Sequence, residues 1–162
     1  MHDRRNARPR NALPRNGRSG LPLAFSSGMQ APTHTVLVVE DEQSIRDILE
    51  ELFTVEGNEV VAAGTLDDAR KALGERVFDL IVTDLRLGGK RDGGLQVMAA
   101  AGILSPEATV IALTAYPDDD NRHASLRLGA THFLQKPVDL STIAGLATPI
   151  GVATALTPSA SA

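Results

Sequence analysis

The chain has 162 residues, no cysteine and a formal net charge of −4 at pH 7. This length suffices for about one domain, and the absence of cysteine excludes disulfides, thiolate nucleophiles and cysteine-based zinc sites. No segment is apolar over the roughly 18 residues that a membrane span requires, so we expect no membrane span. The lack of cysteine fits a reducing cytoplasm, which is the expected location.

The N-terminal residues 1–32 are rich in Arg, Asn, Pro, Gly and Ser, and they contain six arginines but a single acid, Asp3. They lack the periodic apolar residues that would offset the entropy of ordering, so we expect a disordered basic tail. No aromatic residues alternate with the arginines and no helix-turn-helix pattern follows, which argues against direct DNA binding. Met29 stands just before the first predicted strand, which leaves open whether the native protein contains residues 1–28.

The next part of the chain alternates between short apolar runs and helical patterns. TVLVV (35–39) predicts the first strand, and the helix after it carries an apolar stripe from Ile45 to Phe53 that Gly57 is placed to end. EVVAA (59–63) predicts the second strand, after which Thr65 and Asp68 form the start signal of a second helix. FDLIVT (78–83) predicts the third strand.

The alternation continues with a third helix at 94–104, a fourth strand, TVIAL (109–113), a fourth helix from about Asp118 to Gly129, and a fifth strand, THFLQ (131–135). Asp139 is placed to cap a fifth helix that Pro149 ends, and residues 149–162 are expected to form a flexible tail. This order predicts an α/β domain over residues 33–148. Its five-stranded parallel sheet would carry helices on both faces, as in doubly wound, flavodoxin-like folds.

Polar side chains stand just past the last apolar residue of four predicted strands. They are Glu40 and Asp41, Asp84, Thr114, and Lys136. Ligands bind outside the carboxyl ends of parallel strands, so we expect these side chains to share one site. Three clustered carboxylates raise one another's pKa unless a cation opposes their charge, and oxygen ligands without nearby His or Cys suit Mg²⁺.

The ordered motifs VLVVEDE, DLIVTDLRL, ALTA and FLQKP resemble those of the receiver domain of bacterial two-component response regulators, here of the stand-alone type, over about residues 35–147. Thr114 follows Asp84 by 30 residues and Lys136 follows Thr114 by 22, as is usual in that family. The resemblance implies that Asp84 is phosphorylated by a histidine kinase or a histidine phosphotransfer protein. It also implies that Mg²⁺ is bound by Glu40, Asp41, Asp84 and the backbone carbonyl of Arg86, with Lys136 beside the phosphoryl group.

The resemblance further implies a switch. Thr114 and Phe133 would change position on phosphorylation and reshape the face of the fourth helix, fifth strand and fifth helix for an unknown downstream protein or a second copy of the chain. Arg86 and Tyr116 occupy positions that tune how fast water removes the phosphoryl group, and two bulky side chains predict slow loss. The Lys136–Pro137 bond matches one that is cis in the family.

The loop after Asp84 departs from the family, because Gly88 stands where many members have proline and the loop is about two residues longer. Gly88 and Gly89 would loosen this loop, which predicts weaker Mg²⁺ binding than in proline-bearing members.

Two rival functions remain. One is a pseudo-receiver that binds its partner without phosphorylation. The other is a Mg²⁺-dependent phosphohydrolase of the haloacid dehalogenase type, whose nucleophile follows the first strand in a DxD pattern where this chain has EDE. In the leading interpretation the chain catalyses at most its own phosphorylation and dephosphorylation.

Overall fold

A computed structural model describes residues 34–157 of the chain. The basic tail predicted for residues 1–32 lies outside the described residues. Five strands pair in parallel in the order β2-β1-β3-β4-β5, which confirms the predicted doubly wound sheet. The strands are β1 (His34–Val39), β2 (Asn58–Ala63), β3 (Leu80–Asp84), β4 (Thr109–Thr114) and β5 (His132–Gln135).

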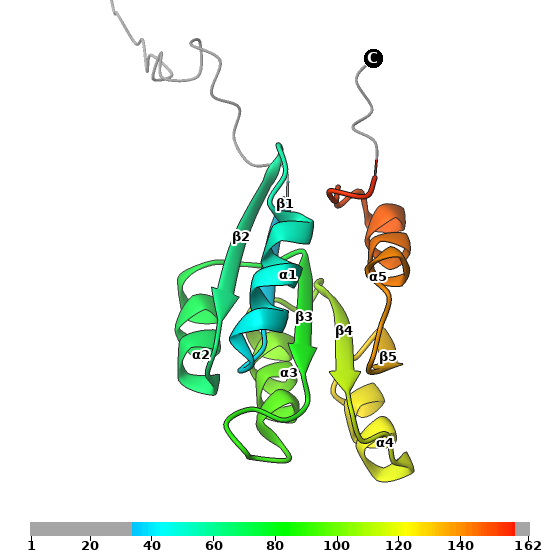
Figure 1. Cartoon of the computed structure of the whole chain (residues 1–162). Coiled ribbons are helices and arrows are strands. Elements are labelled where there is room, and N and C mark those ends of the chain that lie inside the picture. Colours follow the sequence, from blue (N-terminus) through cyan, green and yellow to red (C-terminus); the bar gives the residue numbers. More distant parts are fainter. Residues whose placement is uncertain (1–33, 158–162) are drawn as a thin grey trace, which may run out of the picture. The chain divides into compact units, whose positions relative to one another are not determined.

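Helices cover both faces of this sheet (Figure 1). They are α1 (Gln43–Phe53), α2 (Leu66–Glu75), α3 (Gly93–Leu104), α4 (Asp119–Arg127) and α5 (Leu140–Ala147). Side chains of α1 and α5 pack on one face and side chains of α2 and α3 on the other, while α4 contacts α3. Each crossover connects two parallel strands through a helix, as a parallel sheet requires.

The core is aliphatic because strand residues alternate between the two faces. Val36 and Val38 of β1 pack under α1 and α5, whereas Leu37 and Val39 pack under α2 and α3, and all four are buried. The central strand β3 is buried along its whole length. The strand ends are therefore held in fixed register by a core on each side of the sheet.

Side chains cap the starts of α2 and α4, and the cap of α2 confirms the signal formed by Thr65 and Asp68 in the sequence. The Thr65 hydroxyl accepts a hydrogen bond from the Asp68 N–H at 3.1 Å, and the Asp118 carboxylate accepts one from the Asn121 N–H at 2.7 Å. Asp139 occupies the N-cap position of α5, as predicted, without a side-chain capping bond.

The described C-terminal residues pack against the domain beyond the boundary expected at residue 148. A short 3₁₀ helix, η2 (Thr148–Ile150), follows α5, and Val152 is buried in the α1–α5 core. The Ala155 N–H donates to the Leu52 carbonyl at 2.8 Å, and the Asn58 side-chain amide donates to the Ala153 carbonyl at 2.8 Å. Apolar burial and these hydrogen bonds offset the entropy of ordering the segment up to residue 157. Among residues 34–157, no helix has the length and apolarity needed to cross a bilayer.

Candidate functional site

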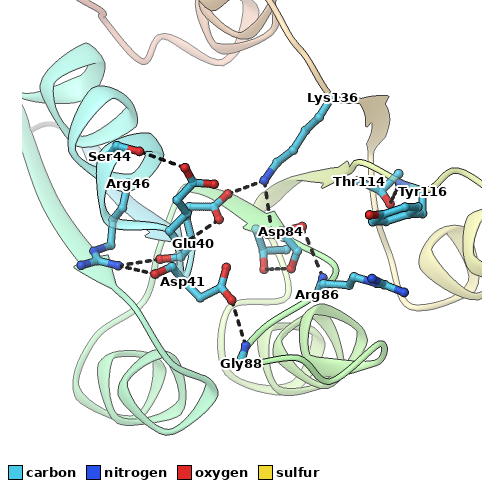
Figure 2. Close-up of polar contacts among 12 residues, drawn as sticks. Glu40, Asp41, Ser44, Arg46, Asp84, Arg86, Gly88, Thr114, Tyr116 and Lys136 are labelled. Carbon is cyan, nitrogen blue, oxygen red and sulfur yellow. Dashed lines mark hydrogen bonds and ion pairs between the residues drawn. The ribbon is translucent and has the colours of Figure 1, made fainter.

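The polar residues predicted at four strand ends meet at one edge of the sheet (Figure 2). Glu40 and Asp41 follow β1, Asp84 ends β3, Thr114 ends β4, and Lys136 follows β5. The strands β1, β3, β4 and β5 are consecutive neighbours in the sheet, so their carboxyl ends lie side by side. The register pairs Asp84 with Leu113 and Thr114 with Gln135.

Three carboxylates and one ammonium form the centre of the site. One ligand atom from each of Glu40, Asp41 and Asp84 lies within 4.8 Å of the others. The Lys136 ammonium donates to Glu40 Oε2 at 2.6 Å and to Asp84 Oδ2 at 3.2 Å. One positive charge therefore opposes up to three negative charges, so the cluster has an excess of negative charge when all of its carboxylates are ionised.

Glu40 is the most deeply buried acid of the cluster, with a side chain that is 1% exposed. Burial raises the pKa of Glu40 to about 7, and the charge of Asp84 adds to the rise, while hydrogen bonds from Lys136 and the Glu42 N–H oppose it. Burial lowers the pKa of Lys136, but the hydrogen bond to Glu40 and the charges of Asp84 and Glu40 outweigh it, so this pKa is raised. Glu40 therefore resists ionisation, while Lys136 stays charged.

The donor set of this cluster fits a hard divalent cation. Its ligand atoms are carboxylate oxygens, with no imidazole or thiolate among them. Such oxygens suit Mg²⁺, and a doubly positive ion would offset the excess negative charge. The Arg86 N–H donates to Asp84 Oδ1 at 3.3 Å, which fixes the first residues of the loop that would supply a backbone carbonyl ligand.

Arg46 of α1 binds the backbone of the acidic loop that follows β1. Sequence reasoning missed this residue. Its guanidinium donates to the carbonyl oxygens of Glu40 at 2.9 Å and Asp41 at 3.3 Å. Gly64 leaves room for this side chain, because a Cβ at Gly64 would lie 2.9 Å from Arg46 Nη1. The signal in the sequence is an arginine in the first turn of a helix that follows an acidic strand end, within a stretch that otherwise shows only the apolar stripe of α1.

Gly94 permits the close approach of α3 to Asp84. A Cβ at Gly94 would lie 2.2 Å from the Asp84 carbonyl oxygen and 2.6 Å from Leu85 Cα, far closer than van der Waals contact. The Gly94 N–H donates to the Leu85 carbonyl at 2.9 Å. The backbone around Asp84 is thus packed directly against the start of α3.

A two-residue hairpin follows Asp84, and we call its residues 87–90 the Gly88 turn. Leu87 and Lys90 exchange two backbone hydrogen bonds of 3.2 and 3.0 Å around Gly88 and Gly89, whose φ angles are +60° and +78°. Positive φ at both central positions is the mark of a type I′ turn, which glycine adopts without strain. The two glycines that were expected to loosen this loop thus meet the backbone requirement of a closed turn.

Thr114, which is expected to act as a switch, lies with Tyr116 on the β4 side of Asp84 (Figure 2). The Thr114 hydroxyl accepts a hydrogen bond from the Tyr116 N–H at 3.1 Å. The Arg86 guanidinium lies 4.3 Å from the centre of the Tyr116 ring, which is cation–π geometry. Phe133 is half-buried against the core under α2 and α3, and the Lys136–Pro137 bond is cis.

Comparison with known proteins identifies the family. Residues 36–147 match the family model of the response regulator receiver domain. The chain belongs to this family. Because the receiver match covers most of the chain, the haloacid dehalogenase alternative has no support.

Two relatives illustrate the similarity of this receiver domain to longer proteins. The chain is 37% identical over 121 residues to the response regulator protein PilR of Pseudomonas aeruginosa, a match that covers 74% of this chain and 25% of PilR. It is 35% identical over 102 residues to the transcriptional regulatory protein AlgB of Pseudomonas putida, covering 63% of this chain and 22% of AlgB. The chain thus spans about a quarter of the length of these curated relatives.

Two solved structures share the fold of this receiver domain. One is a response regulator from Burkholderia pseudomallei, solved with a phosphorylated aspartic acid, a calcium ion and citrate. It is 30% identical to this chain with a TM-score of 0.63, and the match covers 70% of this chain and 65% of that chain. A CheY-like receiver domain from Methanospirillum hungatei is 26% identical with a TM-score of 0.66 and coverage of 72% and 91%.

Proposed function

We propose that the chain is a phosphoacceptor of a two-component phosphorelay, in which Asp84 receives a phosphoryl group from a histidine kinase or a histidine phosphotransfer protein with Mg²⁺. The observation that carries the proposal is the placement of Lys136, whose ammonium donates to both Glu40 and Asp84 where three carboxylates gather. A carboxylate is a poor nucleophile toward an anion, so positive charge at this point is what the reaction needs.

Asp84 is the proposed nucleophile. One of its carboxylate oxygens attacks phosphorus while the P–N bond of the phosphohistidine breaks, and the bonding electron pair returns to the imidazole nitrogen. Hydrogen bonds from Lys136 and the Arg86 N–H fix the orientation of the Asp84 carboxylate. During transfer, the Lys136 ammonium opposes the charge that gathers on the phosphoryl oxygens.

The acidic cluster is the proposed Mg²⁺ site. Asp41 and Asp84 would bind the ion directly and Glu40 mainly through its water, with the Arg86 carbonyl completing the protein ligands. The bound ion supplies positive charge to the phosphoryl oxygens and to the carboxylates. The fit rests on the three carboxylate oxygen donors that lie within 4.8 Å of one another.

Thr114 and Phe133 are the proposed switch. The Thr114 hydroxyl accepts from the Tyr116 N–H, so its own proton is available for a phosphoryl oxygen on Asp84. Movement of Thr114 toward the phosphoryl group would leave space behind it for Phe133, which is only half-buried. The face formed by α4, β5 and α5 would change shape and bind a downstream protein or a second copy of the chain.

The phosphodonor has an apolar surface available beside Asp84. A groove of about 570 Å³ lies between α1 and α5, with Lys136 at its edge. Its lining includes Ile45, Ile48, Leu49, Val138, Leu140 and Ile143. We propose that the kinase or phosphotransfer protein contacts this groove while it presents its phosphohistidine to Asp84.

We expect the reaction to take place in the cytoplasm and the described domain to bind no DNA directly.

Beryllofluoride titration separates this function from that of a phosphorylation-independent pseudo-receiver. Beryllofluoride mimics a phosphoryl group on a carboxylate, so with Mg²⁺ it should bind the wild-type chain and shift the amide NMR signals of Thr114 and of the α4-β5-α5 face. Asp84→Asn should show no such shifts. Identical spectra of the wild-type chain with and without beryllofluoride would favour the pseudo-receiver.

A further inference from the structure

The Gly88 turn is joined directly to the acidic cluster. The Gly88 N–H donates to Asp41 Oδ2 at 3.1 Å, across 47 residues of sequence (Figure 2). Asp41 is exposed and lies in the short loop between β1 and α1, so its side chain is not held by surrounding packing. An ionised carboxylate has about four acceptor positions, and one hydrogen bond leaves the others available for a cation.

The Gly88 N–H, which donates to Asp41, is itself held in place. Leu87, at the base of the Gly88 turn, is 3% exposed and packs in the core under α2 and α3. A Cβ at Gly93 would lie 2.7 Å from Leu87 Cβ, so the start of α3 fixes Leu87 from the other side. The two hydrogen bonds between Leu87 and Lys90 close the turn and direct the Gly88 N–H toward Asp41.

Glycine at position 88 meets a backbone requirement. Nothing lies within 4 Å of a Cβ built on Gly88 or Gly89, so space does not select glycine there, whereas their positive φ angles do. Proline at position 88 would have no N–H and could not adopt φ +60°. A receiver with proline at this position therefore cannot form the bond to the first-loop carboxylate.

We propose that the Gly88 N–H is a positioning group that holds the Asp41 carboxylate toward the metal centre before Mg²⁺ arrives. This inference rests on the proposed function, in which Asp41 binds Mg²⁺. A donor fixed by the core reduces the conformations that the exposed Asp41 side chain must give up on binding the ion. The turn therefore strengthens Mg²⁺ binding, and this replaces the weaker binding that a loose loop predicted.

The test removes the Gly88 hydrogen-bond donor, and the same change makes the Leu87 carbonyl, which accepts from the Lys90 N–H at 3.0 Å, a weaker acceptor. A backbone ester at Gly88, with glycolate in place of glycine, deletes the N–H and keeps the φ angle open to positive values. A backbone ester at Gly89 is the matched control, because the Gly89 N–H donates to no acceptor among residues 34–157. Mg²⁺ titration by calorimetry should show affinity about threefold to tenfold weaker for the Gly88 ester, the range of one charged hydrogen bond at an exposed site. The Gly89 ester should change it less than about twofold.

Three results would overturn the proposal: unchanged affinity in the Gly88 ester, tighter binding in it, or an equal loss in both esters. A second readout needs no semisynthesis and no metal. In metal-free protein, Asp41→Ala should move the Gly88 amide proton signal upfield and speed its exchange with solvent, while the Gly89 amide is unaffected. An unmoved Gly88 signal would show that the bond is absent.

Failure of this inference is distinct from failure of the proposed function. At saturating Mg²⁺ the Gly89 ester should accept a phosphoryl group on Asp84 as the wild-type chain does, whereas the Gly88 ester should need a higher Mg²⁺ concentration for half-maximal phosphorylation. A wild-type chain that takes up no phosphoryl group would defeat the proposed function, while the Mg²⁺ affinities and the Gly88 amide signal would still decide the role of the turn.

Discussion

The Lys136 ammonium donates to the Glu40 carboxylate at 2.6 Å, although 96 residues separate the two and Glu40 is almost fully buried. The same ammonium reaches Asp84 at 3.2 Å. Lys136 thus holds together the first, third and fifth strand ends and supplies the positive charge of the cluster in the absence of a metal ion. Its removal should affect both stability and chemistry.

Lys136→Met should lower the free energy of unfolding by about 1–3 kcal/mol in the absence of Mg²⁺, because a buried carboxylate loses its charged partner. It should also slow phosphoryl uptake by at least about tenfold, since one charged group at the reacting oxygens is lost. Urea unfolding and the rate of labelling by acetyl phosphate measure the two effects. Lys71→Met, at an exposed position of α2, is the control and should leave both unchanged. Wild-type labelling by Lys136→Met would rule out the electrostatic role.

The pKa of Glu40 predicts how the stability of the metal-free protein depends on pH. The folded-state pKa is raised from 4.5 to about 7, so between these values the folded state binds more protons than the unfolded state. Stability from this group is therefore present at low pH and decreases as pH rises through about 7. We expect the wild-type chain to lose about 1–3 kcal/mol relative to Glu40→Gln between about pH 5 and pH 8.

Urea unfolding of both proteins at the two pH values measures this difference. Comparison with Glu40→Gln subtracts the contribution of the groups that titrate alike in both proteins. Saturating Mg²⁺ should reduce the difference, because the ion stabilises the ionised carboxylate. A wild-type chain that gains stability relative to Glu40→Gln as pH rises would mean that the pKa of Glu40 is depressed.

Two glycines of α3 provide a matched pair for the packing around Asp84. Gly94→Ala should destabilise the domain by about 1–3 kcal/mol or more and slow phosphorylation, because its Cβ would overlap the Asp84 carbonyl. Gly102→Ala should stabilise by up to about 1 kcal/mol, because Gly102 is an exposed helical position where a Cβ would lie 4.0 Å from its nearest neighbour, the Leu128 carbonyl oxygen. Thermal unfolding and acetyl phosphate labelling distinguish the two variants. Similar stability changes in both would show that α3 can shift away from Asp84.

The stacked pair of Arg86 and Tyr116 should slow loss of the phosphoryl group. Their 4.3 Å contact spans the gap between the loop after Asp84 and the loop after Thr114, where two large side chains can shield phosphorus from water. Arg86→Ala and Tyr116→Ala should each shorten the phosphoryl half-life by several-fold. The double variant should add less than the sum of the two effects, because each residue holds the other in place. A wild-type half-life of seconds, or additive effects, would contradict a shielding pair.

The fold and the centre of the site could be predicted because both depend on local patterns. Apolar runs separated by helical spacing give the sheet, and the parallel arrangement then brings Asp84, Thr114 and Lys136 to one edge. The supporting contacts could not be predicted, since they join distant backbone atoms to particular side chains. Arg46 reaches two carbonyl oxygens across the acidic loop, and Gly88 reaches Asp41 through a turn whose closure depends on both φ angles.

The packing of the chain beyond Pro149 could not be predicted for a similar reason. The sequence after Pro149 has no strong periodicity, and the packing of Val152 and the bond between Asn58 and Ala153 depend on where α5 delivers the chain. The third strand also begins later than predicted, at Leu80, and the Phe78 N–H donates to the Ser105 hydroxyl while the Asp79 backbone is bonded to Thr35 and Thr109.

Uptake of a phosphoryl group by Asp84 with the help of Mg²⁺ can be measured by incubation with acetyl phosphate followed by intact-mass spectrometry. The wild-type chain should gain the mass of one phosphoryl group when Mg²⁺ is present, and should lose this gain when the ion is chelated beforehand or when Asp84 is replaced in Asp84→Asn. No mass gain in the wild-type chain, or an equal gain in Asp84→Asn, would show that Asp84 is not the phosphoacceptor.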